Sequence, residues 1–159
     1  TRFEWDSWQV GGFLALWVIG YGAVQAVAPR ITGGTAGRGA AIAWAAALTA
    51  LPALIALGLE GKPLEVQPQV VLLGGLMLFG AVFAVNSSLH SFLIVRMARS
   101  DGVSLDVGFY YMANAMGRLI GTLLSGWLYL VGGLTATLWV SSALLAATVL
   151  ISLALPKEA

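Results

Sequence analysis

Five long apolar stretches constrain the fold of this chain more than any other feature of its sequence. They cover residues 7–29, 39–59, 69–95, 103–130 and 134–155. The only charged residues within them are Asp106 and Arg118. A helix needs about 20 mostly apolar residues to cross the hydrocarbon core of a bilayer. The sequence therefore predicts an all-α polytopic membrane protein with five transmembrane helices.

The composition excludes most classes of soluble protein. Of the 159 residues, 59% are hydrophobic and 9% are charged, against about 25% charged in a soluble domain. A chain this short cannot bury so much apolar surface in one core. There is no cysteine and a single histidine, which argues against thiolate chemistry and a protein-only zinc site. We therefore expect no enzyme, no cofactor and no nucleic-acid partner.

The connectors are short, so residues 1–159 are expected to form a single membrane domain. Lysine and arginine divide unequally between the connectors on its two sides. One side has Arg30, Arg38, Arg96, Arg99 and Lys157, and the other has Arg2 and Lys62. The positive-inside rule then predicts an inner (plasma) membrane protein with its N-terminus outside and its C-terminus in the cytoplasm. The chain begins with Thr1 and has no signal peptide, so we expect a processed chain or a fragment.

The fourth stretch carries Arg118 near the middle of the membrane. Placing an arginine there costs at least about 2.5–3.5 kcal/mol, and such residues are usually functional. Tyr110 and Asn114 precede Arg118 at helical spacing and share its side of the helix. A guanidinium holds carboxylate or phosphate oxygens through two parallel hydrogen bonds. These three residues are candidates for binding an anionic substrate.

Two other stretches add polar candidates. Asn86 and His90 lie four residues apart in the third stretch, and Tyr21 and Gln25 lie four apart in the first. A histidine there can donate to an anion or take up a proton near neutral pH. Because polar groups concentrate in the first, third and fourth stretches, we expect these three helices to line a water-filled cavity. The other two would brace it.

Each candidate also has a structural alternative. Arg118 can donate to backbone carbonyls, with Gly117, Gly121 and Ser125 forming a helix-packing seam. His90 can make an interhelical hydrogen bond, and the aromatic residues of the first stretch can serve packing alone.

Residues 5–22, WDSWQVGGFLALWVIGYG, resemble the second helix of either half of a major facilitator superfamily transporter. The following loop, PRITGGTAGR at residues 29–38, keeps two arginines of the family's signature and lacks its acidic residue. The resemblance implies that the five stretches are helices eight to twelve of that fold. Helices eight, ten and eleven would line the cavity, and the partner would be the missing N-terminal half.

Three blocks, residues 10–22, 84–93 and 107–126, resemble the organoarsenical efflux permeases of the ArsJ family. This resemblance implies export of a small organic anion, such as 1-arseno-3-phosphoglycerate, by alternating access and a role in arsenic resistance. It assigns no site residues. The alternatives are a transporter of another anion (a sugar phosphate, a carboxylate or a drug) and a non-transporting assembly subunit. The subunit would pair Arg118 with an acid of a partner helix.

Overall fold

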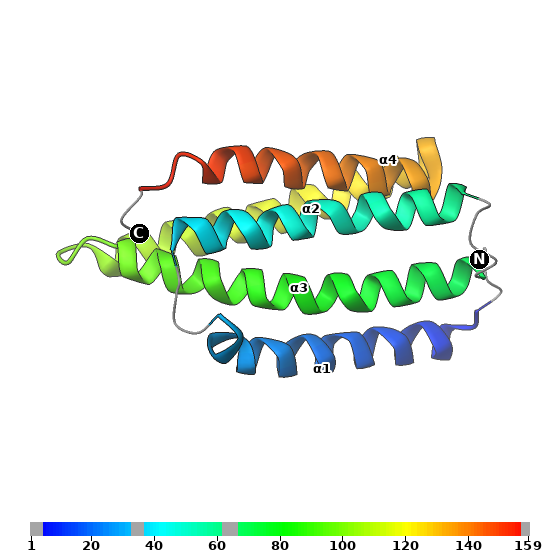
Figure 1. The fold of residues 1–159 in the computed structure, drawn as a ribbon, viewed down its shortest axis with the longest axis horizontal. Coiled ribbons are helices and arrows are strands. Elements are labelled where there is room, and N and C mark those ends of the chain that lie inside the picture. Colours follow the sequence, from blue (N-terminus) through cyan, green and yellow to red (C-terminus); the bar gives the residue numbers. More distant parts are fainter. Residues whose placement is uncertain (1–4, 33–36, 62–66, 157–159) are drawn as a thin grey trace.

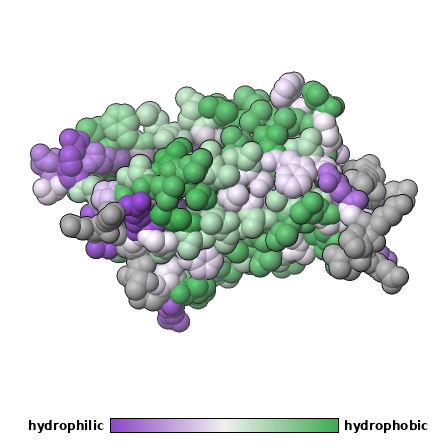
Figure 2. Space-filling model, turned by 45° about the horizontal axis from the view of Figure 1, so that its top comes forward, coloured by the Kyte–Doolittle hydropathy of each residue, from purple (hydrophilic) through white to green (hydrophobic). Residues whose placement is uncertain are grey.

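The computed structural model describes residues 5–32, 37–61 and 67–156 and consists of α-helices joined by short connectors. The helices are α1 (Ser7–Ile31), α2 (Arg38–Glu60), α3 (Pro68–Met97) and α4 (Val103–Ser152), as Figure 1 shows. All four are long and apolar enough to cross a membrane. Hydrophobic residues cover the middle of the molecule and hydrophilic ones gather toward its ends (Figure 2). These features indicate a multi-pass membrane protein.

The structure has four helices where the sequence predicted five, because the last two stretches join. Within α4 only Gly133 departs from helical geometry, with φ 72° and ψ −172°. This conformation is accessible essentially to glycine alone, and it turns the chain at the Gly132–Gly133 pair that separates the two stretches in the sequence. In Figure 1, α4 reverses direction near the end of α2. We call residues 103–132 the first arm of α4 and residues 134–152 the second arm.

Local sequence signals explain where two of the helices begin. The Asp6 carboxylate accepts a hydrogen bond from the Gln9 backbone N–H at 2.8 Å. The Gln9 side-chain oxygen accepts one from the Asp6 N–H at 3.0 Å, which completes a capping box for α1. Pro68 occupies the first turn of α3, where its missing N–H leaves no helical hydrogen bond unmade.

The core of the bundle lies around α2, which packs against both α3 and α4, while α1 packs against α3. Two clusters of buried side chains make the contacts of α2. One consists of Ala41, Leu89 and Leu93, and the other of Ile55, Ala56 and Leu138. The alanines of α2 let its neighbours approach closely, as small residues do between transmembrane helices.

The second arm of α4 runs antiparallel to α2. Leu138 packs beside Ile55, and one turn later the Ser142 hydroxyl donates to the Thr49 carbonyl at 2.7 Å. Thr49 lies three residues before Pro52, which lacks an N–H and interrupts the hydrogen bonds of α2. The carbonyl that loses its helical donor is that of Leu48, four residues before Pro52. The bond from Ser142 therefore lies beside this gap and joins the second arm to α2 where α2 is interrupted.

We predict that Ser142→Ala destabilises the protein and that Ser141→Ala does so much less. The Ser141 hydroxyl donates within its own helix, to the Thr137 carbonyl at 2.8 Å, so its loss breaks no contact between helices. Interhelical hydrogen bonds in membrane proteins contribute about 0.6 kcal/mol on average. Equilibrium unfolding of both variants in the same detergent measures the difference. Equal losses would show that the bond to Thr49 does not stabilise the pair of helices.

Candidate functional site

The contact between α1 and α3 is built around Trp17. Its indole Nε1–H donates across the interface to the Leu76 carbonyl at 2.8 Å. Tyr21, one turn later, stacks on Trp17 with ring centroids 5.8 Å apart. On its other side Tyr21 lies 5.7 Å from the ring of Phe83. Tyr21 therefore holds a position in an aromatic interface, which matches the packing alternative.

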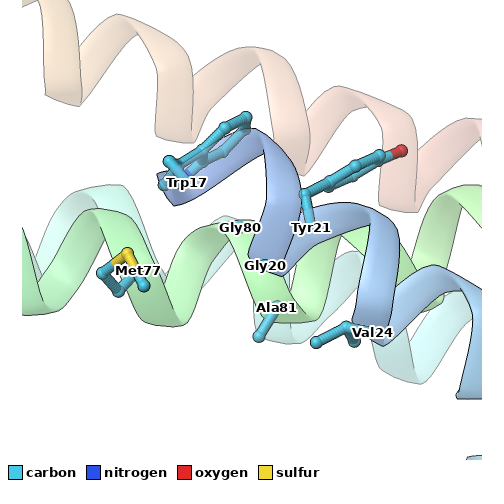
Figure 3. Close-up of a pocket in the computed structure, with 7 residues that line it drawn as sticks. All are labelled: Trp17, Gly20, Tyr21, Val24, Met77, Gly80 and Ala81. Atoms are coloured by element: carbon cyan, nitrogen blue, oxygen red, sulfur yellow. The ribbon is translucent and has the colours of Figure 1, made fainter. Parts of the chain in front are cut away.

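A small pocket of about 90 Å³ lies beside these rings, between α1 and α3 (Figure 3). Its lining residues are Trp17, Gly20, Tyr21, Val24, Met77, Gly80 and Ala81. No lining residue is charged, and small-molecule sites usually enclose about 300–1,000 Å³. The pocket is thus too small and too apolar to hold an organic anion.

Gly80 makes room for the Trp17 indole. A Cβ atom at this position would lie 2.6 Å from Trp17 Nε1 and 2.8 Å from its Cε2. The indole is held by its hydrogen bond to Leu76, so it cannot move aside without losing that bond. The glycine is therefore required by the close approach of α1 and α3.

We predict that Gly80→Ala separates α1 from α3 and lowers the free energy of unfolding by about 1–3 kcal/mol, as overpacking commonly does. Gly74→Ala is the matched control, because it lies in the same helix and a Cβ there meets nothing within 4 Å. Thermal unfolding in detergent measures the loss of stability. Collisional quenching of Trp17 fluorescence, in a variant that lacks the other tryptophans, measures the separation of α1 from α3. Equal stability of the two variants would contradict the prediction.

Asn86 and His90 lie together on α3, as their spacing predicted. His90 Nδ1–H donates to the Asn86 carbonyl at 2.9 Å, which leaves Nε2 as the other polar atom of the ring. The Asn86 side-chain oxygen is buried, and no described residue donates to it. Buried polar atoms are almost always hydrogen-bonded. The Oδ1 atom of the Asn86 side chain is therefore available to a donor from water or from a ligand.

Arg118 and Asn114 lie on the first arm of α4 and, with Tyr111 and Ala115 of the same helix, border a shallow and open region of its surface, which we call the hollow. Both are exposed. Among the described residues no carboxylate pairs with Arg118. The ion pair found in this part of the chain joins Arg99 to Asp106. The guanidinium thus has its hydrogen-bonding capacity free toward this hollow.

Tyr111 is a residue of the hollow that the sequence analysis did not select. It lies seven residues, or about two turns, before Arg118 and so shares its face, whereas the selected Tyr110 is half-buried beside it. The two rings meet edge to face at 5.4 Å. A repeat of seven residues from Arg118 would have identified Tyr111.

The structure divides the seven candidates into two places. Arg118 and Asn114 share the hollow on α4, and Tyr110 lies beside it. The others occupy α1 and α3, namely Tyr21, Gln25, Asn86 and His90. Within the described ranges α1 makes no contact with α4, and α3 touches α4 only slightly. These residues alone therefore do not enclose one cavity.

Charges other than Arg118 lie toward the helix ends. Arg30, Arg38, Arg96 and Arg99 are at the end where α1 and α3 finish and α2 and α4 begin. Arg2, Lys62 and Lys157, which also entered the predicted orientation, lie outside the described residues. Among described acids, Asp6 and Glu60 are at the opposite end, and Asp101 and Asp106 are at the basic end. Arg118 is thus the one cation far from a helix end in this part of the chain.

Comparison with known protein families, with curated proteins and with solved structures finds no match to this chain.

Proposed function

We propose that this protein is a membrane transporter that exports a small organic anion by alternating access. The observation that carries the proposal is the exposed position of Arg118 in the first arm of α4, with no carboxylate paired to it among the described residues. An arginine at this depth is too costly to face lipid. Water, an anion or a polar group of a partner must therefore lie against it, and we propose an anion in water.

The residues around Arg118 suit an oxyanion. The guanidinium offers up to five N–H donors in a planar fork, the Asn114 amide offers two, and the Tyr111 hydroxyl offers one. All three groups belong to one face of the first arm and border the same hollow. Charge-assisted hydrogen bonds of this kind are stronger than neutral ones, so the hollow favours a carboxylate or phosphate group over a neutral solute.

The substrate we propose within this class is an organoarsenical such as 1-arseno-3-phosphoglycerate. The support for it is the likeness of residues 84–93 and 107–126 to the organoarsenical efflux permeases. A phosphorylated arsenate ester carries several negative charges, which fits a site whose described charge is positive. A sugar phosphate or another carboxylate has the same kind of groups and is the alternative within transport.

A second candidate function, an assembly subunit, is favoured by the surface of the first arm. Its large side chains are exposed, for example Leu123 at 67%, and a Cβ at Gly117 or Gly121 would meet nothing within 4 Å. A partner helix with an acidic residue would fit there. In that case Arg118→Lys keeps its function, because a salt bridge needs only the charge, whereas an anion held by the fork is lost.

The test follows arsenic uptake into everted membrane vesicles that contain the intact protein. The vesicles receive arsenate, glyceraldehyde 3-phosphate, NAD and glyceraldehyde-3-phosphate dehydrogenase, and each is then omitted in turn. We expect uptake to require the complete mixture. We also expect Arg118→Ala to reduce uptake about ten- to a hundredfold, as loss of a charged hydrogen bond worth 1.5–3 kcal/mol does.

Ile120→Ala is the matched control, because Ile120 lies on the opposite face of the same arm, and the amount of each variant in the membrane is measured. Normal uptake by Arg118→Ala would support the proposed substrate and show that Arg118 has only a structural role. Uptake of another anion without arsenic would support transport and reject the organoarsenical. Absence of uptake for every anion, with Arg118→Lys retaining association with a partner, would favour the assembly subunit.

A further inference from the structure

The two arms of α4 differ sharply in how they are held. All three buried residues of the helix, Leu138, Ser142 and Ser152, belong to the second arm. That arm is fixed to α2 by the cluster around Leu138 and by the hydrogen bond to Thr49. The first arm has no buried residue, and residues 111–123 are exposed without interruption. The second arm is therefore packed against α2, whereas no described residue covers the first arm over residues 111–123.

Gly133 joins the arms in a conformation that permits bending. It is the one glycine with positive φ among the described residues, and a Cβ there would meet nothing within 4 Å. A side chain would fit there sterically, so glycine is required by the torsion angles, and the Gly133 carbonyl accepts a hydrogen bond from the Thr137 hydroxyl at 2.9 Å. Large changes in φ and ψ at one or a few such positions are how hinges work.

The other end of the first arm is held by an exposed ion pair. Asp106, in its first turn, accepts hydrogen bonds from the Arg99 backbone N–H at 3.0 Å, from Nε at 3.2 Å and from an Nη at 3.1 Å. Arg99 lies in the connector after α3, and its side chain is 66% exposed. The pair is bidentate and is reinforced by the backbone N–H, so it fixes the direction of the arm. Because water reaches Arg99, the pair can exchange for hydration and open.

We propose that the first arm of α4 moves as a rigid body about a hinge at Gly133, and that the Arg99–Asp106 pair selects one of its positions. Arg118 lies 15 residues from the hinge, or about 22 Å along the helix. A tilt of about 20° would therefore displace it by about 8 Å. This inference rests on the proposed function for its purpose, since the movement would carry the anion-binding groups from one position to another.

The experiment measures the angle between the arms directly. The chain has no cysteine, so two spin labels can be attached at Leu123→Cys in the first arm and Leu144→Cys in the second, both exposed. Distances are measured by double electron–electron resonance in lipid nanodiscs. We expect at least two populations, with Asp106→Asn shifting their ratio toward the displaced position. Asp101→Asn, an exposed acid of the same connector, should leave the ratio unchanged.

Two further variants test whether the movement depends on Gly133. Gly133→Ala should remove the interconversion, whereas Gly126→Ala, a helical glycine of the same arm with open space around it, should preserve it. Labels at Leu54→Cys and Leu144→Cys report whether α2 and the second arm still pack together in every variant. A single narrow Leu123–Leu144 distance that is identical in the parent and Asp106→Asn would overturn the hinge. Transport measured on the same samples tests the proposed function separately, because a rigid arm with anion uptake rejects only the hinge.

Discussion

The structure depends on the rule that a backbone in hydrocarbon must satisfy its own hydrogen bonds. This rule makes each apolar stretch a helix and leaves few sites where the chain can depart from helical geometry. Hydroxyl donors lie beside two of the departures that occur. Ser142 supplies a donor beside the turn that Pro52 interrupts, and Thr137 donates from its hydroxyl to the Gly133 carbonyl at 2.9 Å.

Because lipid is as apolar as the helix surfaces, burial of leucine does not determine which transmembrane helices pack together. The contacts that do determine the packing are few and specific. Trp17 needs both the Leu76 carbonyl and the space above Gly80, and together these position α1 on α3. Within the described residues the first arm of α4 has no such contact with another helix, and its ion pair joins it to the connector after α3. This difference explains why the same molecule contains a well-packed core and a long exposed helix that carries Arg118.

Much of the local structure could be predicted from the sequence. The apolar stretches correspond closely to α1, α2, α3 and the two arms of α4, and the four-residue spacing correctly placed Asn86 beside His90 and Asn114 beside Arg118. The count of five separate helices was not confirmed, because the last two stretches form the arms of α4, which meet at Gly133 without a connector. Asn114 and Tyr110 lie four and eight residues before Arg118, and this spacing of four leaves out Tyr111. A spacing of seven residues also returns to the same face of a helix.

The order of apolar and charged residues is enough to predict membrane-spanning helices and to place one cation near the middle of one of them. The tertiary structure alone decided which candidates share a site. It placed Tyr21 in an aromatic interface with α3 and left Arg118 on a helix that α1 does not touch. Helical periodicity fixes which residues share one face, whereas the neighbour of that face depends on contacts between residues distant in the chain.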